Sequence, residues 1–147
     1  MSHRRIQTFK TRIGWRGFTL LELMVVLLIL ALLASIAAPR VTKYLRKAKT
    51  DTAKIQVHAL AAAVDSFQLD TGRFPTNDEG LKVLVDRPPN TANWDGPYIT
   101  KRDSLIDPWG KLYFYKIPGR VSDYDIYTLG SDQKEGGEGD AADVGNW

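Results

Sequence analysis

The feature that most limits how this chain can fold is a long apolar run near its start. Residues 18–38 read FTLLELMVVLLILALLASIAA, 21 residues in which Glu22 is the only charge. A helix that crosses a hydrocarbon core of about 30 Å needs roughly 20 residues, so the run is long enough to span a membrane. The apolar region of a secretory signal peptide is shorter, about 7–15 residues. The length therefore favours a membrane-spanning helix over a cleaved secretory signal.

Charge is unevenly distributed around this run. The 147 residues have a net charge of +3, but residues 1–17 hold five basic residues and no acid, so the remainder carries 3 − 5 = −2. A short basic segment ahead of a first span is most simply retained in the cytoplasm, which places the chain after Arg40 on the other side. Five basic residues also follow the run, so counting alone gives no orientation: Arg40, Lys43, Arg46, Lys47 and Lys49.

Glu22 needs an explanation because a carboxylate inside a membrane span is costly, about 2.5 kcal/mol or more at the centre of a helix. If the chain were cut between Gly17 and Phe18, a new α-amino group would appear one helical turn away. In an assembly, that ammonium group can pair with Glu22 of a neighbouring subunit. The alternative is a protonated or interfacial Glu22 without a special role.

The residues from Arg16 to Glu22, RGFTLLE, resemble the class III signal of type IV pilins and pseudopilins. The resemblance implies that a prepilin peptidase cuts after Gly17, that Phe18 is then N-methylated, and that Glu22 supports assembly. It divides the chain into a cleaved basic leader (1–17), a transmembrane and assembly helix (18–38) and a periplasmic globular domain (39–147).

A helical pattern continues beyond Pro39, which is expected to kink the helix without starting a new element. Gly72 marks the expected end. Apolar and small residues recur at helical spacing, which predicts one buried stripe. Its members are Val41, Leu45, Ala48, Thr52, Ile55, Leu60, Val64 and Phe67.

The rest of the chain predicts an α+β fold. Asn77 or Asp78 is expected to cap a short helix, and residues 107–110, DPWG, predict a tight turn. Residues 112–117 and 124–129 are rich in Tyr, Phe and Ile and predict an antiparallel hairpin. The sheet is expected to cover the long helix at Leu60, Val64 and Phe67.

This region resembles the major pseudopilins of the type II secretion system more than the type IV pilins. The resemblance implies a type IV pilin-like fold with a Gly- and Asp-rich C-terminal loop. Type IV pilins usually close this region with a disulfide, and the chain has no cysteine. The matching segments are residues 71–76, 80–81, 84–85, 107–110, Tyr113, Tyr115, and residues 129–132, 136–139 and 143–147.

The acidic, Gly-rich residues 129–147 allow two interpretations. Composition alone favours a solvated, partly disordered tail. The alternative is a calcium loop, since calcium takes 6 to 8 oxygen ligands from carboxylates, carbonyls and water. The spacing does not fit an EF-hand.

The resemblance favours calcium and implies Asp132, Asp140 or Asp143, and the carbonyl of Leu129 as ligands, with Ser131 close by. Gln133 stands where the family commonly has Gly, and it is a poorer occupant if the backbone there requires a positive φ.

These features indicate a structural subunit and no enzyme. The resemblance implies a short periplasmic filament that promotes export of folded proteins across the outer membrane. Its implied partners are other copies of the chain, minor pseudopilins, the inner-membrane secretion platform, the outer-membrane secretin and the prepilin peptidase and N-methyltransferase. The alternatives are an adhesive or motility type IV pilin and a membrane-anchored hydrolase using Asp123 and Asp125. Nucleic-acid binding is disfavoured because the mature chain is acidic.

Overall fold

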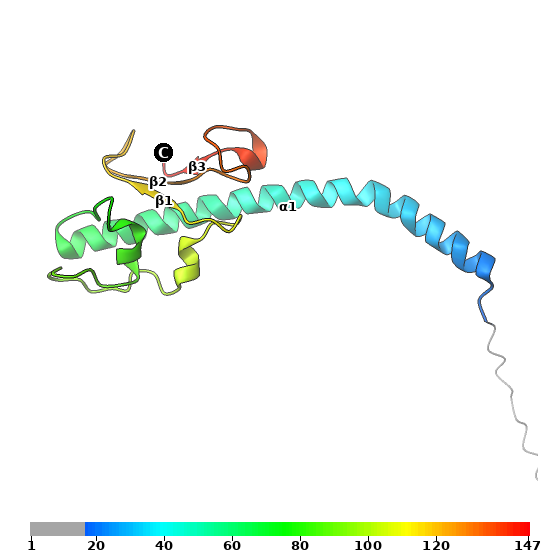
Figure 1. Cartoon of the computed structure of the whole chain (residues 1–147), viewed down its shortest axis with the longest axis horizontal. Coiled ribbons are helices and arrows are strands. Elements are labelled where there is room, and N and C mark those ends of the chain that lie inside the picture. The colour runs from blue at the N-terminus through cyan, green and yellow to red at the C-terminus, as the bar shows by residue number, and fades with distance from the viewer. Residues whose placement is uncertain (1–16) are drawn as a thin grey trace, which may run out of the picture. The chain divides into compact units, whose positions relative to one another are not determined.

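The structure is a computed structural model that describes residues 17–147 (Figure 1). The chain forms two compact units that meet between Pro39 and Arg40, and each is described by itself. The expected α+β fold, a long N-terminal helix with a small antiparallel sheet, is confirmed. The elements are α1 (Leu20–Thr71), the 3-10 helices η1 (Gly80–Leu84), η2 (Arg102–Leu105) and η3 (Gly139–Ala141), and the strands β1 (Phe114–Lys116), β2 (Asp125–Thr128) and β3 (Val144–Gly145).

The first unit contains the apolar beginning of α1. Thr19 caps the helix, because its hydroxyl accepts a hydrogen bond from the Glu22 backbone N–H at 3.1 Å and its carbonyl accepts one from Leu23 N–H at 3.1 Å. Every side chain from Leu20 to Pro39 is exposed within the described chain. By length and composition, the helix is long enough and apolar enough to cross a membrane.

Helix α1 continues through Pro39 and ends at Thr71, where Gly72 adopts a φ of 74°. The predicted stripe is only half right. Its second part is buried, but Val41, Leu45 and Ile55 are 55%, 61% and 71% exposed. Five residues separate Ile55 from Leu60, a rotation of about 140° around the helix, so the predicted set joins two different faces. The buried residues are Ala53, Val57, Leu60, Ala63, Val64 and Phe67.

The sheet has the order β1-β2-β3, and both pairings are antiparallel. The predicted hairpin is confirmed, with Phe114 opposite Tyr127 and Lys116 opposite Asp125. Strand β3 was not predicted, because two residues are too few for a strand pattern. Asn146 extends its pairing, since its side-chain oxygen accepts a hydrogen bond from Ile126 N–H at 2.8 Å.

The sheet lies beside the C-terminal half of α1, as the sequence predicts (Figure 1). Two tyrosines join them through hydrogen bonds. The Tyr113 hydroxyl donates to Gln56 Oε1 at 2.7 Å, and the Tyr124 hydroxyl lies 2.7 Å from Asp65 Oδ1. Burial raises the pKa of both phenols well above the usual value, so both stay protonated donors at physiological pH.

The predicted turn at residues 107–110 is confirmed. Gly110 N–H donates to the Asp107 carbonyl at 3.0 Å, and Asp107 Oδ1 accepts hydrogen bonds from Trp109 N–H and Lys111 N–H at 2.9 and 2.8 Å. The other carboxylate oxygen of Asp107 accepts a hydrogen bond from the Thr128 hydroxyl on β2. This buried aspartate therefore fixes the turn to the sheet.

The prediction that Asn77 or Asp78 caps the short helix is wrong. Thr76 and Glu79 bond to each other instead: Thr76 N–H donates to Glu79 Oε2 at 2.9 Å, and Glu79 N–H donates to the Thr76 hydroxyl at 3.3 Å. Asn77 is used elsewhere, because its side chain bonds to both backbone groups of Ile117, at 2.7 and 2.9 Å. It thereby holds the end of β1.

Glu79 predicts a loss of stability in acid. Arg73 donates two hydrogen bonds to its carboxylate, at 2.7 and 2.8 Å, and these lower its pKa to about 2. The unfolded chain therefore takes up a proton at higher pH than the folded chain, so the stabilisation is present above about pH 4.5 and is lost towards pH 2. Because the pair is partly exposed, we expect Glu79→Gln to cost on the order of 1 kcal/mol at neutral pH.

The measurement is the free energy of unfolding of the full chain in detergent at several pH values. Glu79→Gln is expected to flatten the acid side of the curve, whereas Asp78→Asn, a change at an exposed neighbouring acid, is expected to leave it unaltered. An unchanged acid slope in Glu79→Gln would contradict the assignment.

Candidate processing, assembly and calcium sites

The predicted cleavage point lies just ahead of α1. Residues 17–19 are outside regular structure, and Phe18 is 78% exposed. A Cβ added to Gly17 would meet no heavy atom within 4 Å. The bond between Gly17 and Phe18 is therefore neither held in helical hydrogen bonds nor covered within the described chain. The rest of the predicted leader, residues 1–16, lies outside the described residues.

Glu22 lies in the first turn of α1, with its side chain exposed. An acid here favours the helix, since its charge is close to the positive end of the helix dipole. In residues 17–147, no basic side chain forms a salt bridge with Glu22. A cationic partner for this carboxylate therefore has to come from outside that part of the chain.

The C-terminal loop is an ordered structure closed by backbone contacts. Ser131 N–H donates to the Asp140 carbonyl at 2.8 Å. Gly130 adopts a φ of 66°, and a Cβ there would lie 2.8 Å from the Asp140 carbonyl oxygen and 2.9 Å from that of Ala142. Only glycine fits this close approach, so this path of the loop depends on Gly130.

Gln133 adopts a positive φ of 58°, the backbone conformation in which glutamine is expected to be a poorer occupant than glycine. A side-chain hydrogen bond offsets part of the cost of this backbone conformation, because Gln133 Nε2 donates to the Gly130 carbonyl at 2.5 Å. The residue therefore fits the loop in a backbone conformation usually taken by glycine.

The three predicted acidic ligands have different surroundings. Asp143 Oδ2 accepts a hydrogen bond from Gly136 N–H at 3.0 Å, while Asp143 Oδ1 is buried and has no hydrogen-bond partner among the described residues. Asp132 Oδ1 accepts one from Lys134 N–H at 3.1 Å. Asp140 Oδ2 lies 3.8 Å from Arg46 Nε.

A buried carboxylate oxygen without a partner fits a cation ligand, because burying a charge is costly unless it is paired. Residues 17–147 contain no group of three or more acidic, His or Cys side chains that could share a metal ion. A calcium ion at this loop would thus need main-chain carbonyls and water besides carboxylates, which is a normal ligand set for calcium. Of the two alternatives, Asp143 fits better than Asp140, whose carboxylate is near Arg46.

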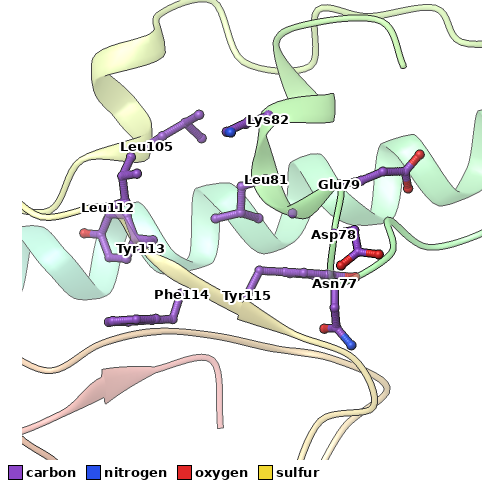
Figure 2. A pocket seen from close by; sticks show the side chains of 11 residues that line it. Asn77, Asp78, Glu79, Leu81, Lys82, Leu105, Leu112, Tyr113, Phe114 and Tyr115 are labelled. Carbon is purple, nitrogen blue, oxygen red and sulfur yellow. The ribbon is translucent and has the colours of Figure 1, made fainter. Parts of the chain in front are cut away.

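A hollow of about 270 Å³ lies between η1 and β1 (Figure 2). Its apolar wall includes Leu81, Leu105 and Phe114. The Glu79 carboxylate at its edge is bound by Arg73. The charged side chains in its lining are Asp78, Glu79 and Lys82, and none of the lining residues is a histidine, serine or cysteine.

The aspartates considered for a hydrolase do not form a catalytic pair. Asp125 on β2 is 0% exposed, and its Oδ2 accepts a hydrogen bond from Arg120 N–H at 3.0 Å. Asp123 is exposed on the preceding loop. Through this hydrogen bond to Arg120, Asp125 fixes the loop that precedes β2. The Arg120 guanidinium in turn packs 4.9 Å from the centre of the Trp147 ring.

A second hollow, of about 480 Å³, lies between α1 and the C-terminal loop. In the sequence, the basic residues at positions 40–49 bear only on membrane orientation, and Lys54 lies outside that group. Helical spacing could have predicted a basic face from the sequence. Lys43, Lys47 and Lys54 are four and seven residues apart, which places them on one face of the helix. Arg46 lies beside them, and Asp140 lines the loop side.

Comparison with known proteins agrees with this architecture. The family described as Type II secretion system (T2SS), protein G matches residues 40–147, and the prokaryotic N-terminal methylation motif matches residues 16–38. The type II secretion system core protein G of Pseudomonas aeruginosa is 44% identical over 136 residues, which cover 89% of this chain and 94% of that protein. The Vibrio cholerae protein of the same name is 45% identical over 134 residues, covering 89% and 90%.

A solved structure is also similar. The crystal structure of the major pseudopilin from the type 2 secretion system of enterohaemorrhagic Escherichia coli matches with a TM-score of 0.58 and 37% identity, over 69% of this chain and 84% of that chain.

The fold and the N-terminal motif define a membrane-anchored, pilin-like structural subunit. The chain belongs to the type II secretion system protein G family, the major pseudopilins. This family is structural and is not a known family of enzymes. The pseudopilin interpretation is therefore confirmed over the type IV pilus alternative.

Proposed function

We propose that the chain is made as a prepilin, inserted in the inner membrane through residues 18–38, with residues 39–147 in the periplasm. A prepilin peptidase would cut between Gly17 and Phe18 and leave an N-methylated Phe18. The match to the methylation motif at residues 16–38 supports this proposal. So does the exposed position of Gly17 and Phe18 ahead of the helix, where a protease can reach the peptide bond.

The intact mass and N-terminal sequence of the membrane-extracted protein test this step. The expected mature chain begins at N-methylated Phe18. A retained leader, or a chain that begins near Ala38, would contradict the proposal.

The mature subunits would then assemble into a short homopolymeric filament that promotes export of folded proteins across the outer membrane. Minor pseudopilins, the inner-membrane platform and the outer-membrane secretin are the proposed partners. The observation that supports assembly is the exposed apolar surface of α1. All side chains from Leu20 to Pro39 are exposed within the described chain. Sister helices in a bundle would cover this surface and would bring the Phe18 amine of one subunit to Glu22 of another.

Glu22→Gln is expected to be inserted and processed normally but to give several-fold fewer filaments. The amide keeps the size of the side chain but removes the charge that would pair with the new ammonium group. Filament yield per processed subunit is the measurement, and Asp123→Asn, at an exposed acid far from the N-terminus, is the control. Normal yield in Glu22→Gln would exclude the pairing role.

The C-terminal loop would bind calcium as a structural ion. Asp143 and Asp132 are the proposed carboxylate ligands, with the Leu129 carbonyl; Asp140 is the less favoured alternative to Asp143. The buried, unpartnered Oδ1 of Asp143 is the observation that supports this site. Bound calcium would supply the positive charge that this oxygen lacks and would stabilise the loop.

A further inference from the structure

We propose that the first turns of α1 in the second unit bind the phosphate groups of anionic phospholipids. The binding surface is a basic face formed by Arg40, Lys43, Arg46, Lys47 and Lys54. The inference rests on the membrane anchoring of the chain but not on calcium binding or filament assembly.

The basic face follows from helical spacing. Positions 40, 43, 47 and 54 are three, four and seven residues apart, which places their side chains along one side of α1. Arg46 lies one position from Lys47 and widens the same side. All five residues are exposed. The face is therefore accessible to a ligand.

The charge of this segment is largely uncompensated. Residues 40–54 hold six basic residues and one acid, Asp51, a net charge of +5 (6 − 1). Among the described residues, the only salt bridge made by this segment joins Arg46 to Asp140, at 3.8 Å, and the Arg46 side chain is still 63% exposed. Neighbouring like charges repel one another, so an anion bound here would relieve that repulsion.

The structure also provides space for a headgroup. The hollow of about 480 Å³ between α1 and the C-terminal loop is lined by four basic residues and two acidic ones, Asp51 and Asp140, so basic side chains predominate. The basic residues are Lys43, Arg46, Lys47 and Lys54. The four cations outnumber the two carboxylates, and several donors around one open hollow match a phosphate group better than a carboxylate, because phosphate presents more acceptor oxygens at once.

The place of the basic face in the chain favours a membrane lipid over other anions. Arg40 follows the membrane-spanning segment directly, and helix faces rich in Lys and Arg are attracted electrostatically to anionic lipids at a bilayer surface. Tyr44, 74% exposed, is of the type enriched at membrane interfaces. Val41 and Leu45 are exposed on another side of the helix, which makes the segment a basic amphipathic helix, typical of membrane surfaces.

Lipid binding would hold each subunit at the membrane surface until it enters the filament. A subunit that leaves the bilayer gives up these contacts, so the lipid would oppose premature extraction. An acidic loop of a second copy is the competing occupant, and the experiment distinguishes the two.

The test uses the full chain in nanodiscs made of phosphatidylcholine alone or of phosphatidylcholine with phosphatidylglycerol. A water-soluble amine reagent labels exposed lysines, and mass spectrometry measures each site. We expect Lys43, Lys47 and Lys54 to be labelled about fivefold more slowly in the anionic discs. High salt should remove the protection. Lys101 and Lys111, exposed elsewhere on the second unit, are the internal controls and should not change.

A paired substitution makes the test specific. Lys43→Gln with Lys47→Gln should lower the amount of phosphatidylglycerol that is retained when the protein is extracted, whereas Lys101→Gln with Lys111→Gln should not. Equal labelling in both kinds of disc would overturn the proposal. Protection that follows the number of protein copies per disc, independent of lipid charge, would also overturn it and would assign the face to a second copy.

Discussion

Phe67→Ala is expected to destabilise the second unit by about 3–5 kcal/mol, a large share of the roughly 5–15 kcal/mol that holds a typical domain folded. Phe67 is 0% exposed and lies where α1 meets the loop that contains Tyr98. The rings of Phe67 and Tyr98 pack edge to face, 5.9 Å between centres, and the Arg73 guanidinium lies 5.5 Å from the Phe67 ring. Truncation removes these contacts and leaves a cavity in a small core.

The measurement is thermal unfolding of the full chain in detergent, followed by near-ultraviolet circular dichroism. The expected drop in Tm is more than about 10 °C. Leu69→Ala is the matched control, since Leu69 is two residues away on the same helix and is 80% exposed. Its expected change is within about 0.5 kcal/mol. Similar losses in both variants would contradict the division of α1 into a buried and an exposed face.

That division was only partly predictable from the sequence. Periodicity located α1, its end at Gly72 and the core residues Leu60, Val64 and Phe67. Periodicity did not separate the exposed apolar face from the buried one. Ile55 and Leu60 each lie three or four residues from another member of the predicted stripe, so both fit a helical pattern although they face different sides. From the sequence alone, an exposed apolar residue such as Ile55 cannot be distinguished from one that is buried in the core of its own domain.

The connections show a similar limit. The Asp107 turn was predictable because proline fixes the φ of Pro108 and glycine tolerates the positive φ of 87° that Gly110 adopts. The role of Glu79 was missed although Thr76 and Glu79 have the local T-x-x-E spacing of a capping box. The role of Asn77 was not predictable, because its partner Ile117 is chosen by tertiary structure. Local rules describe what a side chain can bind nearby, whereas a contact over forty residues depends on the completed fold.

For the candidate calcium site, the family resemblance predicted which residues act as ligands, and the structure shows what surrounds each of them. The sequence left Asp140 and Asp143 equivalent. In the structure, Arg46 lies next to the first and an unpartnered buried oxygen belongs to the second. This difference depends on where α1 lies against the C-terminal loop, and no local pattern contains that information.

Removing calcium is expected to lower the Tm of the full chain in detergent by about 10 °C or more, if calcium is first supplied at about a hundred times its Kd. An ion that binds only the folded loop stabilises it by mass action, and release returns Asp143 Oδ1 to an unpartnered state. The measurement is thermal unfolding with calcium, with a chelator, and with magnesium. Magnesium is expected to substitute poorly because it requires near-octahedral geometry and keeps its waters.

Asp143→Asn separates ion binding from the rest of the loop's stability. The amide oxygen can still accept the Gly136 N–H bond, so the loop keeps that contact while the ion loses a charged ligand. We therefore expect the variant to lose most of the calcium-dependent rise in Tm, yet to melt close to the unsubstituted chain in the chelator, where no buried charge has to be neutralised. Glu135→Gln, at an exposed acid of the same loop, should keep the full calcium response. Equal melting of the unsubstituted chain with calcium and with chelator would exclude a structural ion, whereas an equal response of Asp143→Asn and Glu135→Gln would mean that the loop binds calcium through other ligands.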